Sequence, residues 1–94
     1  MQIVLVDRQK SLIDEWAKVF SGIDSVTIRH DSVFEMSCDA LVSPANSFGF
    51  MDGGLDWAIS EFFGWHVQKR LQQIIQAKYH GELLVGMAEI VPTD

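Results

Sequence analysis

The chain alternates short apolar runs with longer segments of helical periodicity, and this alternation limits the fold more than any other feature. Runs typical of strands cover Ile3–Val6, Ser25–His30, Ala40–Val42 and Leu83–Val91. Apolar residues recur at helical spacing in three segments, Ser11–Phe20, Leu55–Phe63 and Val67–Ile75. Because parallel strands are joined by helical crossovers of this length, the order predicts an α/β fold with helices packed on a sheet. We expect one domain over residues 1–94.

The residues at the segment ends sharpen these predictions. The first apolar run is continuous and rich in β-branched residues, so we expect a strand buried on both faces. Ser11 is the expected N-cap of the first helix, and Gly22 is the glycine expected after its C-terminus. Gly64 separates or kinks the two later helices, and the second of these is expected to end at His80–Gly81. Gly86 predicts a bend or bulge in the last strand.

Charge and cysteine content exclude several classes of function. Seven Lys and Arg residues against thirteen Asp and Glu residues give a net charge of -6, which disfavours bulk binding to nucleic acid or anionic membranes. Cys38 is the only cysteine, so no intramolecular disulfide can form, and its position before an apolar run suits a small core residue. No apolar run has the length of a membrane span and no signal peptide is evident, so we expect a cytoplasmic protein.

Residues 44–54 hold three glycines, a proline and an asparagine between the third apolar run and the second helix. Such a composition is typical of a loop whose backbone approaches a ligand closely. Ligands of α/β sheets lie beyond the carboxyl ends of strands, and a helix that starts near Gly54 presents free N–H groups with a partial positive charge. A diphosphate fits this pattern, and Asn46 and Asp56 are placed to bracket a sugar. A plain structural turn is the alternative, in which Asn46 bonds only to the loop backbone and Asp56 only stabilises the helix.

The same stretch resembles the first ligand loop of the macro domain family. The family pattern is a strand that ends in Val-Asp-Ala-Ile-Val-Asn-Ala-Ala-Asn, followed by a glycine-rich loop and Val-Asp-Gly-Ala-Ile. Asp39–Val42 and Ala45–Asn46 match the first part, and Gly53–Ile59 matches the second. The separation of Asn46 from Asp56 equals that in hydrolytic members of the family.

This resemblance implies a macro-domain-like mixed β-sheet packed between helices, of which the chain holds the N-terminal portion and is expected to be incomplete at its C-terminus. It also implies that the chain binds ADP-ribose or an ADP-ribosylated substrate. In hydrolytic members the matching Asn orients the proximal ribose and the matching Asp orients or activates water, so Asn46 and Asp56 are the expected catalytic residues. The expected ligand-binding residues are Asp31, Ser32, Ala45, Asn46, Ser47, Phe48, Gly49, Phe50, Gly53, Gly54, Leu55 and Asp56. No metal and no cofactor is implied.

The chain departs from the family pattern at three places. Ser43 stands where the family has its first Asn, and Pro44 follows it. Met51 and Asp52 interrupt the glycine run, and Asp52 adds a negative charge beside an expected anionic ligand. The family's Gly-Asp-Ile motif, whose Asp reads the adenine amino group, aligns with Asp31-Ser32-Val33, so the acidic residue is displaced by one position.

Three functions remain open at this stage. The first is an enzyme of the mono-ADP-ribosyl hydrolase or O-acetyl-ADP-ribose deacetylase type. The second is a reader that binds ADP-ribose or a related nucleotide without turnover, and the third is an interaction protein with a silent, incomplete pocket. Phe48 and Phe50 either cover the ligand or anchor the loop in the core. An incomplete sheet would expose an edge, so we expect a homo-oligomer or pairing with the remainder of a longer chain.

Overall fold

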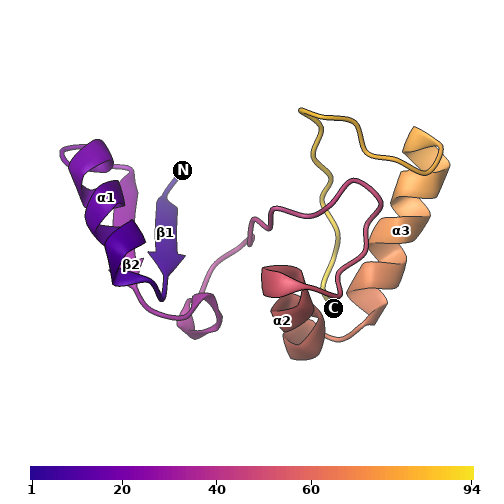
Figure 1. The fold of residues 1–94 in the computed structure, drawn as a ribbon, viewed down its shortest axis with the longest axis horizontal. Helices are drawn as coiled ribbons and strands as arrows, with labels where there is room; N and C mark the ends of the chain where they lie inside the picture. Colours follow the sequence, from indigo (N-terminus) through magenta and orange to yellow (C-terminus); the bar gives the residue numbers. More distant parts are fainter. The chain divides into compact units, whose positions relative to one another are not determined.

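The computed structural model describes all residues, 1–94, and has an α/β element order (Figure 1). The elements are β1 (Ile3–Asp7), α1 (Lys10–Phe20), β2 (Val26–His30), a 3-10 turn (Val33–Glu35), α2 (Gly54–Phe63) and α3 (His66–Tyr79). The chain divides into two compact units, residues 1–39 and residues 40–94. The α/β class predicted from the alternation is therefore confirmed, with a small sheet.

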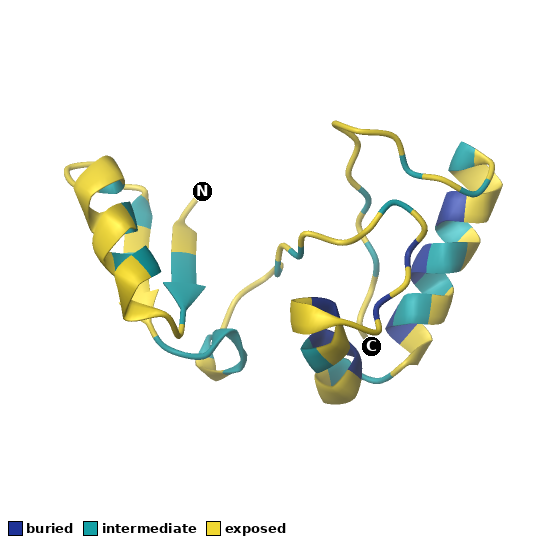
Figure 2. Cartoon of the chain, in the orientation of Figure 1, coloured by how far each residue is buried: buried dark blue, intermediate teal, exposed yellow.

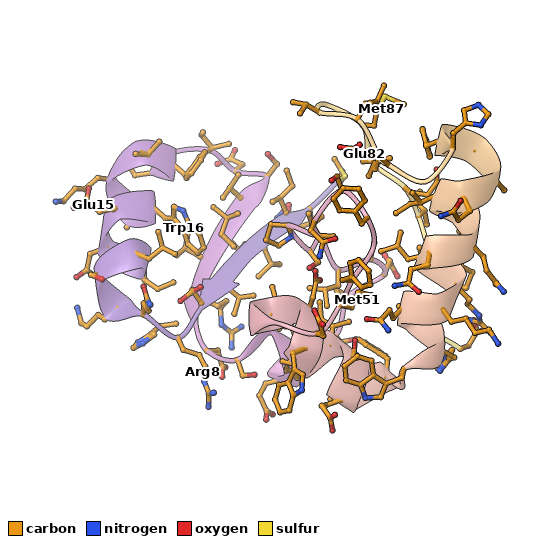
Figure 3. The ribbon with its side chains drawn as sticks, turned by 45° about the vertical axis from the view of Figure 1, so that its right-hand side comes forward. Arg8, Glu15, Trp16, Met51, Glu82 and Met87 are labelled. Carbon is orange, nitrogen blue, oxygen red and sulfur yellow. The ribbon has the colours of Figure 1, made fainter.

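The first unit is a single strand–helix–strand crossover. β1 and β2 pair in parallel, with Ile3 opposite Val26 and Asp7 opposite His30. α1 lies alongside this sheet, and Trp16 points from the helix toward the strands whereas Glu15 points away (Figure 3). The parallel pairing confirms what the helical connection predicted.

Three predictions for this unit were wrong. The first strand is not buried on both faces: Ile3 and Val4 are 40% and 39% exposed, because the sheet has only two strands and this unit only one full helix. The first helix begins at Lys10 rather than after Ser11 as N-cap, and the Asp7 carboxylate accepts a hydrogen bond from the Gln9 N–H at 2.8 Å. Cys38 is exposed and not part of a core.

The second unit holds all the buried residues of the chain, as Figure 2 shows. They lie on α2, on α3 and in the loop before α2. The buried apolar side chains are Met51, Ile59, Val67, Leu71 and Ile75. The core of this unit is therefore formed by one face of each helix and a segment of irregular backbone.

The two later helices follow the predicted boundaries. Gly64 lies between them with φ +112°, a conformation that a residue with a side chain rarely adopts, and therefore separates α2 from α3. α3 ends at His80 and Gly81, which both have positive φ and donate their N–H groups to the Ile75 carbonyl. The predicted end at His80–Gly81 is confirmed.

Neither Ala40–Val42 nor Leu83–Val91 forms a strand. The second unit contains no strand, so these apolar runs have no ladder to join, and Val42 is 88% exposed. Gly86, with φ +88°, turns the second run back so that the Met87 N–H donates to the Leu84 carbonyl at 3.1 Å. Consequently the loop before α2 does not leave the carboxyl end of a strand, contrary to the prediction.

Polar contacts attach the C-terminal segment, residues 82–94, to α3 instead. The Glu89 carboxylate accepts from the Tyr79 hydroxyl at 3.0 Å and from the Lys78 ammonium at 3.3 Å. These hydrogen bonds lower the pKa of Glu89, and the bond to Glu89 raises the pKa of Tyr79. Farther along, Arg70 donates to the Pro92 carbonyl at 2.9 Å. The segment is thus bonded to the helix without forming a strand.

Candidate functional site

The glycine loop, residues 43–54, is held in shape largely by the Asn46 side chain. Its Oδ1 accepts hydrogen bonds from the N–H groups of Phe48 and Phe50, each at 3.1 Å, and its Nδ2 donates to the Phe50 carbonyl. An asparagine amide has two acceptor positions and two N–H donors. Asn46 therefore bonds to the loop backbone, as expected for a plain structural turn, and one N–H of its side-chain amide has no partner in the loop.

Gly49 and Met51 attach the loop to the helices. A Cβ on Gly49 would lie 3.0 Å from Ile75 Cδ1 and 3.2 Å from Gln72 Cγ, so only glycine allows the loop to approach α3 so closely. Met51 is buried, and its labelled position in Figure 3 is where the loop meets α2 and α3. Its N–H donates to Gln68 Oε1 at 2.8 Å, and its carbonyl accepts from the buried Ser60 hydroxyl at 2.9 Å.

Asp56 lies in the first turn of α2 and is buried, with a relative exposure of 7% for the whole residue. The Ser43 hydroxyl donates a hydrogen bond to its Oδ1. A buried carboxylate needs hydrogen-bond donors or a positive partial charge to remain ionised, and the N-terminus of a helix supplies the second. The start of the loop and the start of α2 are thus joined through a buried, oriented carboxylate.

The backbone at the start of α2 is unobstructed. Gly53 is the N-cap residue and has no side chain to cap the helix, so the first N–H groups of α2 have neither an intrahelical nor a capping partner. A Cβ built on Gly53 or on Gly54 would meet nothing within 4 Å. Gly54 also has φ +56°, which favours glycine. The free N–H groups of this turn can donate hydrogen bonds to an anion.

The other predicted ligand-binding residues of the loop lie on its surface. Phe48 and Phe50 are 52% and 53% exposed, so they do not anchor the loop in the core, and Gly49 and Met51 do so instead. Ala45 and Leu55 are also exposed, whereas Ser47 is half-buried and accepts a hydrogen bond at its carbonyl from the Leu83 N–H at 2.7 Å.

Asp31 and Ser32 belong to the first unit, whereas the other ten predicted ligand-binding residues belong to the second. They follow the carboxyl end of β2, and the Ser32 N–H donates to Asp31 Oδ1 at 2.8 Å. A cleft of about 570 Å³ is lined there by Arg8, His30, Asp31, Ser32 and Glu35. A polar cleft of this volume lies within the range of small-ligand sites.

Some residues that shape the site carried no signal in the sequence. Ser43 stood out only as a departure from the family pattern, yet its hydroxyl holds the Asp56 carboxylate. Ser60 and Gln68 lie on helices without any motif, and both fix Met51. A polar residue on the apolar face of a predicted helix was the one available indication, and it applies to Ser60, which lies three residues before the apolar Phe63.

The structure groups no three His, Cys, Asp or Glu side chains so that they could hold a metal ion. No helix has both the length and the apolar character needed to cross a bilayer. Comparisons with protein-family models, with curated proteins and with solved structures found no match to the chain.

Proposed function

We propose that this chain binds ADP-ribose through residues 43–56 in the manner of a macro domain. The observation that carries the proposal is the first turn of α2, where uncapped N–H groups, two open glycines and a buried carboxylate lie within four residues. The N–H groups suit the diphosphate, because a helix N-terminus favours anions and its hydrogen bonds need no basic side chain. This explains how a chain of net charge -6 can bind an anion.

The proximal ribose would lie between Asn46 and Asp56. The remaining N–H of the Asn46 amide can donate to a ribose hydroxyl, and Asp56 Oδ2 can accept from another, since Ser43 bonds to Oδ1. Two departures from the family pattern have opposite effects on the proposed site. Ser43 donates a hydrogen bond to the Asp56 carboxylate, whereas Asp52 is exposed and adds negative charge.

A second candidate function, hydrolysis of an ADP-ribose linkage, is favoured by the burial of Asp56. A carboxylate held by one hydrogen bond and shielded from bulk solvent can accept a proton from a bound water molecule. The water oxygen would then bond to the anomeric carbon of the proximal ribose, while the bond from this carbon to the acceptor breaks and the acceptor keeps the electron pair. An acceptor that leaves as a carboxylate needs no added proton.

Two matched variants test both functions. Asp56→Asn keeps the shape and an oxygen acceptor for Ser43 but cannot take up a proton at physiological pH. We expect it to lower hydrolysis of mono-ADP-ribosylated protein about 10²- to 10⁴-fold, the range for loss of a general base, while ADP-ribose binding is kept. Asp52→Asn removes the same charge from the exposed loop surface and is expected to leave turnover intact and to bind ADP-ribose at least as tightly.

The outcomes separate the two functions. ADP-ribose binding without turnover in the wild-type chain would restrict the function to a reader. Full turnover by Asp56→Asn would remove this residue from the mechanism. If folded wild-type protein does not bind ADP-ribose, as judged by calorimetry, both functions are refuted and the interaction-protein hypothesis takes their place.

A further inference from the structure

A groove of about 740 Å³ lies between the glycine loop and α3, and no residue of the first turn of α2 lines it. The residues that line it are Phe48, Phe50, Lys69, Gln72, Gln73, Gln76, Ala77 and Gly81. All belong to the second unit, and neither Asp56 nor Gly53 nor Gly54 is among them. The volume lies within the range of small-molecule sites. The groove therefore shares Phe48 and Phe50 with the loop of the proposed function, but none of the first turn of α2.

The α3 side of the groove is a stripe of polar side chains. Lys69, Gln72, Gln73 and Gln76 are spaced at three, four and seven residues, so they share one face of the helix. The three glutamine amides of this stripe make no hydrogen bond within the chain, and Lys69 makes no ion pair. The stripe thus offers unused amide donors and acceptors beside one unpaired cation.

The loop side of the groove is aromatic. Gly49 lies against Gln72, Leu71 and Ile75, and this close approach brings its two neighbours, Phe48 and Phe50, to the rim of the stripe. Both rings are about half exposed, so each leaves an aromatic surface for a ligand. Aromatic side chains of this kind stack on nucleobases.

The charge of the lining favours an anion. Lys69 is the only charged residue among the eight, although acidic residues outnumber basic ones by thirteen to seven in the whole chain. A lysine ammonium binds phosphate as a point charge. A glutamine amide can both donate to and accept from the edge of an adenine base.

We propose that this groove binds a purine nucleotide, with the base against Phe48 and Phe50 and the phosphate on Lys69. The amides of the α3 stripe read the edge of the base. Phe48 and Phe50 also lie within the loop of the proposed function, but this proposal uses no atom of Asp56 and no N–H group of α2, so the two can be tested separately.

The test is an NMR titration of the whole chain with AMP, adenosine and inorganic phosphate, following the backbone amide resonances of α3. We expect AMP to shift the resonances of residues 69–77, to bind more tightly than adenosine, and to bind more tightly than phosphate. Lys69→Gln should make AMP and adenosine bind equally, whereas Lys18→Gln on α1, the same change at another exposed lysine, should not. Phe50→Ala should weaken AMP about 5- to 150-fold, the range for loss of one stacking partner.

Phe62→Ala is the control for removal of an exposed aromatic ring outside the groove and should leave AMP affinity unchanged. Both groove variants should fold, since Lys69 is exposed and Asn46 holds Phe50 only through its backbone. Absence of AMP-induced shifts in residues 69–77 would overturn the proposal, as would equal affinity of Lys69→Gln and wild type for AMP. AMP shifts in residues 69–77 that persist in Asp56→Asn would support a groove separate from the first turn of α2, whereas their loss in that variant would overturn it. Absence of shifts in residues 53–56 on addition of ADP-ribose would refute the proposed function alone.

Discussion

Replacing Gly49 by alanine tests whether the glycine loop is attached to α3 in the way the structure describes. The residue has φ +80°, which costs an L side chain roughly 1–2 kcal/mol. The new methyl group would lie 3.0 Å from Ile75 Cδ1, 3.2 Å from Gln72 Cγ and 3.3 Å from Leu71 Cγ. Overpacking of this kind typically costs about 1–3 kcal/mol, and because the nearest atom, Ile75 Cδ1, is the free end of its side chain, we place the cost in the lower half. We expect Gly49→Ala to lower the free energy of unfolding by about 2–4 kcal/mol.

Gly53→Ala is the matched control. Gly53 has φ -142° and open space around its Cβ position, so alanine meets no clash there. Alanine is a poorer N-cap than glycine but reduces the entropy of the unfolded chain, and the two small effects offset each other to within about 0.5 kcal/mol.

The assay is urea denaturation followed by tryptophan fluorescence in a Trp16→Phe background, so that only Trp57 and Trp65 of the second unit report. A loss of several kcal/mol would be a large share of the roughly 5–15 kcal/mol that stabilises a typical domain. If Gly49→Ala and Gly53→Ala unfold at the same urea concentration, the close approach of the loop to α3 is wrong.

Three further predictions concern the polar contacts of the second unit. Asn46→Ala removes three loop hydrogen bonds and should cost about 1–3 kcal/mol of local stability, seen as faster amide exchange of the loop; unchanged exchange would contradict this. Ser60→Ala leaves the Met51 carbonyl unpaired in the core and should lower the free energy of unfolding in urea by about 1–3 kcal/mol, which an unshifted midpoint would disprove. The pKa of Glu89 is lowered in the folded state, so its contacts stabilise the fold above its usual pKa of 4.5, and this stabilisation is lost as the pH falls through the lowered pKa. Tyr79→Phe should raise the pKa of Glu89 in an NMR titration, and an unchanged pKa would argue against the contact.

Much of the helical structure could be predicted from the sequence, because local periodicity determines which segments can bury one face. The boundaries of α2 and α3 follow from the apolar spacing on either side of Gly64 and from the glycine after His80. The parallel pairing of β1 with β2 follows from the helix that joins them. These features depend on residues that are near one another in the chain.

The two predicted strands that do not form show where this reasoning fails. Ala40–Val42 and Leu83–Val91 have the composition of strands, but a strand also needs a partner to accept and donate its ladder hydrogen bonds. The second unit offers none, and Gly86 and the contacts of Glu89 give the latter run another conformation. Apolar composition alone does not supply that partner.

The residues of the candidate site could be predicted from the sequence, but the contacts between them could not. Asn46, Asp56 and the glycines were identified from residue type and spacing, and the structure gives each a definite environment. The support of Asp56 by Ser43 and of Met51 by Gln68 and Ser60 links residues from different elements. No local pattern encodes such contacts, because they depend on how the loop packs against the helices.

An NMR titration of the folded chain with ADP-ribose is the most direct test of binding at the first turn of α2. We expect saturable shifts of the backbone amide resonances of Gly53, Gly54, Leu55 and Asp56, since their N–H groups would bond to the diphosphate. We also expect a shift of the Asn46 side-chain amide, whose remaining N–H would meet the ribose. If these resonances do not move while the protein remains folded, the glycine loop is a structural connection and not a ligand site.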